Sequence, residues 1–246
     1  MELRTANPAL NPKSFEGMPA LAAGETMTLQ GTVNKTGILL LCVFATAAWT
    51  WNQVSTSGEV GWSLGIGVIG GLIFGLVTTF KRNWAPVTAP IYALLEGLVI
   101  GGVSAMLELQ FPGIAMQAAG MTFGTLFCLL LAYRSGLIRA TENFKLGVVA
   151  ATGGIALVYF VSMILGFFGT GIPFIHESGL IGIGFSLLVV GIAALNLVLD
   201  FDFIESAAGQ GVPRYMEWYA AFGLIVTLIW LYIEMLRLLS KLRDRR

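Results

Sequence analysis

The sequence predicts an all-α membrane protein, a bundle of seven transmembrane helices. Apolar residues make up 56% of the chain and charged residues 11%, whereas soluble domains have about 25% charged residues. Seven apolar stretches are long enough to cross a hydrocarbon core, which takes about 20 helical residues. The predicted spans are 36–52, 61–80, 88–107, 113–133, 146–168, 179–199 and 215–239. Nothing in them alternates in polarity as a β-barrel strand does.

These spans divide the chain into three parts. Residues 1–35 are polar and are expected to form a mobile cytoplasmic tail, residues 36–240 hold the seven helices, and residues 241–246 form a basic C-terminal tail. The first part does not look like a signal peptide, because no short apolar segment follows a basic start. Since the connections between spans are short, we expect one bundle without a soluble domain.

Basic residues near the spans predict the orientation. Nine of them flank the spans on one side, whereas the loops on the other side, 53–60, 108–112 and 169–178, contain none. Because cytoplasmic loops carry the excess of Lys and Arg, the N-terminus is expected in the cytoplasm. The nine are Arg4, Lys13, Lys35, Lys81, Arg82, Arg134, Arg139, Lys145 and Arg214.

The end of the last span departs from this rule. Either the first six spans fix the topology and the last one follows, or the last apolar segment does not fully cross. Full crossing is favoured because 218–233 contains no charged residue. Full crossing puts five basic residues on the non-cytoplasmic side of the membrane: Arg237, Lys241, Arg243, Arg245 and Arg246.

Small residues recur at a spacing of four in several spans, which lets helix backbones approach closely where lipid supplies no hydrophobic drive. We therefore expect them to be helix contacts. The sets are Gly67, Gly71 and Gly75; Gly97, Gly101 and Ala105; Gly120 and Gly124; and Gly182 and Ser186.

Polar groups at membrane depth are the functional candidates, because each is costly to bury. Glu96 lies near the middle of the third predicted span. A carboxylate there loses most of its hydration, so we expect it to face the bundle interior. It is either a protonated or hydrogen-bonded structural residue or a member of an ion or proton path.

Three acids, Asp200, Asp202 and Glu205, form a dense group where the sixth predicted span ends. Asp200 follows Asn196 by four residues, so both lie on one face if the helix continues. Asp202 and Glu205 are expected in the headgroup region, either as a solvated helix end or as the mouth of a cation path. Crowded oxygen ligands attract a hard divalent cation such as calcium, although no firm metal site is predicted.

The last span carries Thr227, Glu234 and Lys241 at intervals of seven, with Arg237 three residues after Glu234. Glu234 and Arg237 can pair locally. They form either a structural salt bridge or a latch between this helix and its neighbours. Glu217, near the start of the span, is within reach of the acids on the preceding loop.

Other functional classes find little support. Residues 61–65 match the Gly-x-Ser-x-Gly spelling of a nucleophile elbow, but that motif needs a strand-to-helix turn and a histidine partner. This copy opens a span, and the single histidine, His176, falls in a short outer loop. We expect no enzyme, no cofactor apart from a transient calcium ion, and no nucleic-acid partner. Cys42 and Cys128 are interpreted as packing residues.

Four segments resemble the Bax inhibitor-1/YccA family of small seven-helix membrane proteins, specifically its bacterial branch. Each motif alone is loose, and their order and spacing over residues ~30 to 240 make the resemblance specific. The segments are Asn34-Lys35-Thr36, Pro90 to Gly97 with Gly101, Leu199-Asp200-Phe201, and Trp230 to Arg237.

This resemblance implies six helices around a central seventh, in a bacterial inner membrane. It also implies a pH-sensitive calcium leak and restraint of cell death or membrane-protease activity. In the family, an acid ending the sixth helix faces an acid in the seventh, and two close carboxyls coexist by sharing a proton. Asp200 matches the first acid. The place of the second falls near Thr227, so Glu217 and Glu234 stay candidates, and Arg237 matches a family arginine that pairs with an acid of another helix.

Three functions follow as hypotheses. The first is a leak for calcium or another cation, gated by proton exchange at Asp200 and an acid of the last helix. The second is a non-conducting regulator that binds a membrane protease or another membrane protein. A proton-coupled transporter ranks last, because the sequence has no convincing internal repeat.

Overall fold

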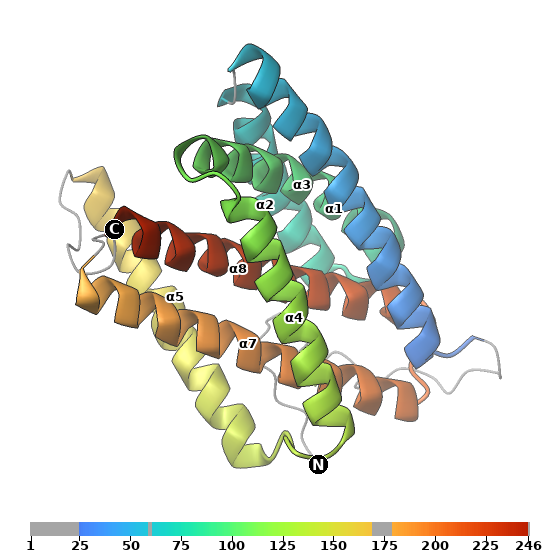
Figure 1. Ribbon diagram of the computed structural model, residues 1–246. Helices are drawn as coiled ribbons and strands as arrows, with labels where there is room; N and C mark the ends of the chain where they lie inside the picture. The colour runs from blue at the N-terminus through green and yellow to red at the C-terminus, as the bar shows by residue number, and fades with distance from the viewer. Residues whose placement is uncertain (1–24, 59–60, 169–178, 246) are drawn as a thin grey trace.

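The computed structural model describes residues 25–58, 61–168 and 179–245 (Figure 1). Within these ranges, seven helices are long and apolar enough to cross a membrane. They are α1 (Leu29–Ser57), α2 (Gly61–Phe80), α3 (Ala85–Gln110), α4 (Ile114–Arg134), α5 (Glu142–Phe167), α7 (Leu180–Gly209) and α8 (Met216–Asp244), with a short 3-10 helix η3 (Arg82–Trp84) before α3. The predicted fold class is confirmed. The expectations for residues 1–24 and for His176 lie outside the described ranges.

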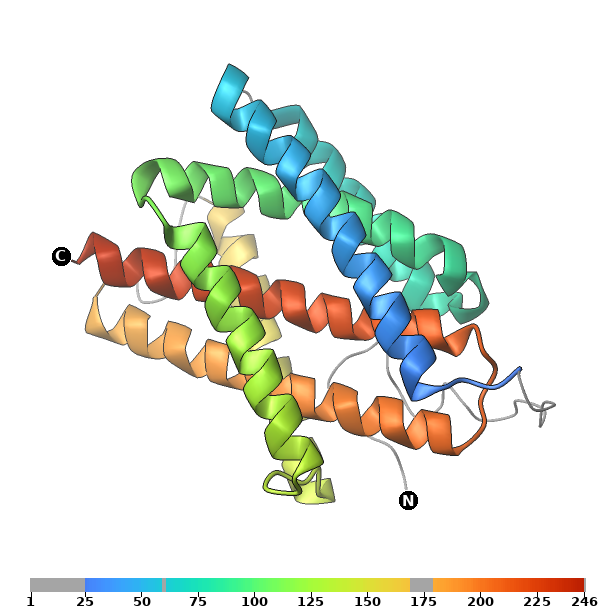
Figure 2. The ribbon, with the colours of Figure 1, turned by 45° about the vertical axis from the view of Figure 1, so that its right-hand side comes forward.

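The last helix, α8, lies at the centre of the bundle. It packs against α1, α3, α4 and α7, and a larger share of its apolar window is buried (67%) than in any other described span. By contrast, α2 packs on α3, and α5 packs on α7 (Figure 2). α8 is one continuous helix of 29 residues, and at ~1.5 Å per residue it is about 43 Å long, enough for a full crossing.

Three helices extend by five residues or more beyond the spans predicted from hydropathy. α1 begins at Leu29, so Lys35, expected in the tail, lies inside a helix. α7 continues to Gly209 and α8 to Asp244, so the acids after residue 199 and Lys241 are helical too. Hydropathy detects only the apolar part of a helix, whereas polar turns extend it when their side chains are capped or paired.

The small-residue spacings mark helix contacts in α2 and α3. A Cβ added at Gly97 or Gly101 of α3 would collide with the α1 backbone, Gly101 meeting Ala47. In α2, a Cβ added at Gly67 would lie 2.6 Å from Val99 of α3 and one at Gly71 would lie 2.7 Å from Glu96, whereas Gly75 makes an ordinary contact with Tyr92. Gly120 and Gly124 of α4 face open space, so the expected contact is wrong for that pair. Spacing alone does not say which face of a helix meets a neighbour.

Candidate functional site

Two glutamates of the central helix are buried at opposite ends. The side chains of Glu217 and Glu234 are each 2% exposed. Seventeen residues separate them, which corresponds to about 25 Å along a helix that rises ~1.5 Å per residue. They therefore belong to two separate polar clusters.

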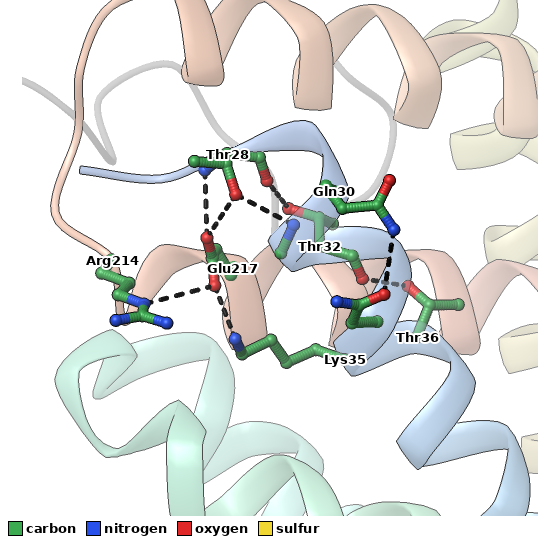
Figure 3. A network of polar contacts seen from close by, with 9 residues as sticks. Thr28, Gln30, Thr32, Lys35, Thr36, Arg214 and Glu217 are labelled. Carbon is green, nitrogen blue, oxygen red and sulfur yellow. Dashed lines mark hydrogen bonds and ion pairs between the residues drawn. The ribbon is translucent and has the colours of Figure 1, made fainter. Parts of the chain in front are cut away.

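Glu217, in the first turn of α8, binds the start of α1 (Figure 3). Its Oε1 accepts hydrogen bonds from the backbone N (3.0 Å) and the Oγ1 (2.9 Å) of Thr28, and its Oε2 lies 2.7 Å from Lys35 Nζ. Arg214 Nε lies 4.0 Å away at the exposed rim. We call Thr28, Lys35 and Glu217 the N-terminal clamp, because they join α1 to α8. The sequence had placed Glu217 near other acids, and its basic partner was missed.

A glycine makes room for this clamp. The Glu217 carboxylate lies so close to Gly31 that a Cβ added there would collide with both of its oxygens. Thr28 also caps α1 by accepting a hydrogen bond from the Gly31 N–H at 2.9 Å. Beside the clamp, the Met27 N–H donates to the Val212 carbonyl at 2.7 Å. The chain before α1 is thus attached to the turn between α7 and α8.

The second cluster surrounds Glu234. Arg237 Nη1 lies 3.0 Å from Glu234 Oε1, which confirms the predicted local pair. Tyr159 of α5 donates its hydroxyl to Glu234 at 3.0 Å and accepts from Arg237 at 2.5 Å. The guanidinium also lies over the Tyr159 ring, 5.0 Å from its centroid. Tyr159 was missed in the sequence, where its only signal is a lone hydroxyl in an apolar span.

Near the end of α8, Lys241 is buried rather than part of a solvated tail. Its Nζ donates to the Gly182 carbonyl at 3.1 Å and to Ser186 Oγ at 2.9 Å. A long lysine stem can lie along apolar surface while its ammonium reaches polar atoms. These bonds attach the end of α8 to the start of α7, and they fix the register of the two helices.

Asp200 is fully buried in α7. α7 and α8 run side by side in opposite directions in both views (Figures 1 and 2), with Lys241 opposite Ser186 at one end and a short turn at the other. This register places Asp200 level with residues 225–227 of α8. Glu217 and Glu234 are then each roughly 10–15 Å away along the helix axis.

The contacts described above for Glu217 and Glu234 are made with Thr28, Lys35, Tyr159 and Arg237. Two carboxyls share a proton only when they are close neighbours, and such sharing between Asp200 and either glutamate stays a prediction. The residue near the level of Asp200 is Thr227, which is buried and donates to the Gly223 carbonyl at 3.4 Å. A threonine thus stands where the family resemblance places the second acid.

Glu96 lies apart from these groups. It is half-buried on α3 and faces α2, where a Cβ added at Gly71 would lie 2.7 Å from Glu96 Oε1. The small residue in α2 gives the carboxyl its space. Glu96 contributes to the contact between α2 and α3, and its place in an ion path stays a prediction.

Both acids of the expected cation mouth have partners from other helices. Asp202 Oδ2 lies 2.8 Å from Lys145 Nζ of α5, and the Lys145 side chain is 2% exposed. Glu205 Oε2 accepts a hydrogen bond from Tyr133 of α4 at 2.6 Å. In the described part of the chain, no group of three or more His, Cys, Asp or Glu side chains is arranged to hold a metal ion.

Comparison with known proteins gives one match. Residues 7–244 match the family model described as Bax inhibitor 1 like. This match covers nearly the whole chain, including both clusters of α8. Neither the curated proteins nor the solved structures contain a match.

Proposed function

Because the chain belongs to the Bax inhibitor 1-like family, we propose that this integral membrane protein is a cation leak, for calcium above all, that opens by proton exchange at Asp200. The observation that carries the proposal is the complete burial of the Asp200 side chain in α7, beside the central helix. Ionisable residues inside a membrane span are costly and mark ion or proton pathways. A change of charge at this position changes the stability of the contact between α7 and α8.

The proposed gate uses a single acid. With Asp200 protonated, α7 and α8 pack closely and the path is closed. Loss of the proton places a charge in this contact, which favours separation of the helices and entry of water. The leak therefore grows as the pH rises. Thr227 cannot ionise, so the proton-sharing pair of the family is replaced by one titrating group.

Several ionisable groups on neighbouring helices lie around the C-terminal part of α7, which contains Asp200. Their charges contribute to the electrostatic environment of the proposed gate. Their contacts support the proposal by holding the C-terminal part of α7 and the start of α8 in place while the middle of α8 responds to Asp200. The groups are Lys145 of α5 with Asp202, Tyr133 of α4 with Glu205, Tyr219 and Glu217 of α8, and Lys35 of α1.

The ion path is proposed to leave the bundle past Asp202 and Glu205, which follow Asp200 on α7. Their oxygens suit calcium, and they become available when Lys145 and Tyr133 are displaced. Arg237 holds Glu234 and Tyr159 together at the other end of α8. We assign it the role of a latch between α8 and α5.

The test is calcium flux into dye-loaded liposomes over about pH 6–8, around neutral pH, with wild-type protein and matched variants. Wild-type flux is expected to rise with pH. Asp200→Asn keeps the shape but removes the charge, so its flux should lose most of the pH dependence. Asp202→Asn removes an acid of the proposed exit on the same helix and should change the pH dependence less than Asp200→Asn does. An unchanged profile in Asp200→Asn removes Asp200 from the gate.

A wild type without flux at any pH would contradict the leak itself. It would instead favour a non-conducting regulator that binds a membrane protease or another membrane protein. In that case Asp200→Asn should leave liposome permeability at the level of empty liposomes.

A further inference from the structure

A cavity of about 500 Å³ lies between α1, α3, α4 and α8, within the ~300–1,000 Å³ range of small-molecule sites. Small side chains in its wall leave this space. Ala47 of α1 and Ala115 and Ala119 of α4 are among the residues of the wall, and Gly101 of α3 lies in it against the Ala47 backbone. The lining is otherwise largely apolar.

One side of the cavity faces the surroundings of the bundle. At its lip, Phe44 is 53% exposed and Met116 is 79% exposed, whereas Ile225 and Leu228 on its floor are buried. Phe44 stacks on Phe123 of α4 with ring centroids 6.3 Å apart, so two rings meet across the opening. Because all four helices are candidate membrane spans, the medium at this lip is lipid. An occupant enters from the bilayer.

Polar groups lie at one end of the cavity. Ser104 Oγ and the Tyr232 hydroxyl are 2.7 Å apart, and a bond between two hydroxyls uses only one of their two protons. The other proton can be donated to an acceptor in the cavity. Glu108, also in the lining, is already bound, because its carboxylate accepts from the N–H groups of Gly113 and Ala115 at the start of α4.

This lining does not suit a cation. Its single acid, Glu108, is already bound by the N–H groups of Gly113 and Ala115. Without Lys or Arg, the lining does not suit an anion either. A hydrated ion would lose water without gaining ligands. The lining instead matches an apolar chain that carries one hydrogen-bond acceptor near its end.

The position of the hydroxyl pair along α3 indicates which class of apolar ligand the cavity suits. Ser104 precedes the end of α3 at Gln110 by six residues, which is about 9 Å at ~1.5 Å per residue. A membrane lipid has its ester carbonyls a short distance below the headgroups, with the apolar chains continuing inward. Ser104 lies a comparable distance inside the end of α3, and the apolar part of the cavity continues from it toward the middle of the bundle.

We propose that the cavity binds one acyl chain of a bilayer phospholipid, whose ester carbonyl accepts a hydrogen bond from the Ser104–Tyr232 pair. The chain lies between α1 and α4 and contacts the central helix through Leu228 and Ile229. This site does not depend on the proposed leak. It makes the packing around α8 sensitive to the lipid that occupies it.

The test uses a phospholipid with a photoreactive diazirine in its acyl chain, added to the full chain in bilayers. Labelling of Leu228 and Ile229 is diagnostic, because both side chains are buried in α8 and line the cavity. Leu228 and Ile229 should label in a saturable manner that excess unlabelled phospholipid suppresses. Leu72, 64% exposed on α2, should label in proportion to the probe without saturation.

Two phenylalanine variants form a matched pair. Ala119→Phe fills the cavity from α4 and should lose most of the α8 labelling. Ala45→Phe adds the same ring to an exposed position of α1 outside the lining and should keep it. If Ala119→Phe does not fold, Ser104→Ala gives the second measurement, since it should need more probe to saturate α8.

Four outcomes overturn the site. They are an unlabelled α8 in the wild type, α8 labelling that never saturates, full α8 labelling in a folded Ala119→Phe protein, and a saturation curve that Ser104→Ala leaves unchanged. Suppression by free fatty acid but not by phospholipid would overturn the choice of ligand.

Discussion

Lys35 and Glu217 form an ion pair of 2.7 Å although they are 182 positions apart in the chain. The pair connects the first helix to the central one at the end of the bundle where α1 and α8 begin. Glu217 also accepts two hydrogen bonds from Thr28. A buried carboxylate is tolerated only while donors surround it, so the attachment of α1 depends on all three residues.

We expect Glu217→Gln to destabilise the fold by about 2–4 kcal/mol, since breaking a buried pair leaves its partner uncompensated. Chemical unfolding in detergent, followed by tryptophan fluorescence, measures the change. The control is Glu142→Gln, whose side chain is 45% exposed and 3.5 Å from Lys145; exposed pairs contribute only about 0–1 kcal/mol. Equal losses in the two variants would contradict the importance of the clamp.

Gly31→Ala tests the same clamp from the other helix. The added methyl group collides with the Glu217 carboxylate, and such overpacking costs about 1–3 kcal/mol. Gly37→Ala is the matched control, because nothing lies within 4 Å of a Cβ there, and alanine should gain up to about 1 kcal/mol in a helix. Thermal unfolding of the two variants should therefore shift in opposite directions. A Gly31→Ala protein as stable as the Gly37→Ala protein would show that the Glu217 side chain can adopt another conformation without loss of stability.

The cluster around Glu234 is expected to contribute less to the stability of the fold than the N-terminal clamp does. Tyr159→Phe removes the hydroxyl that bonds both Glu234 and Arg237, and hydrogen bonds to charged groups contribute about 1.5–3 kcal/mol. Unfolding measured in the same detergent should show a loss in this range. Tyr133→Phe removes an exposed bond to Glu205 and is expected to change little. The reverse order of the two losses would speak against a connection from α5 to α8 through Tyr159.

Local features of these sites could be predicted from the sequence. The seven spans follow from hydropathy, and the pair of Glu234 with Arg237 follows from their spacing of three on one helix. Asp200 is a candidate because it follows a long apolar run and matches a family acid, whereas its complete burial is seen only in the structure. Each of these inferences needs only neighbouring residues.

Contacts between distant helices could not be predicted in the same way. Lys35 meets Glu217, and Lys145 meets Asp202, only because the helices have a particular rotation and register. Spans that are apolar on every face contain no periodicity that reveals this rotation. Lys241 was assigned to the tail for a related reason, since its charge says nothing about the carbonyl that it reaches.

The contacts at the end of α8 bear on the topology. Lys241 bonds the start of α7 through Ser186. Arg243 donates to the Pro112 carbonyl at 2.7 Å and to Gln117 at 2.8 Å, between α3 and α4. Two of the basic residues that break the charge rule are thus bound to protein at the end of the bundle that lacks basic loops.

We therefore expect the C-terminal end of α8 on the opposite side of the membrane from the loop between α4 and α5. In a variant without Cys42 and Cys128, Asp244→Cys should react with a membrane-impermeant maleimide added outside intact cells. Leu137→Cys, in the α4–α5 loop and 82% exposed, should react only after the membrane is disrupted. Because Lys241 and Arg243 are compensated by carbonyl and amide oxygens, their charge does not hold the end of α8 in the cytoplasm. Labelling of both cysteines from the same side would mean that α8 does not cross, and that six spans alone set the topology.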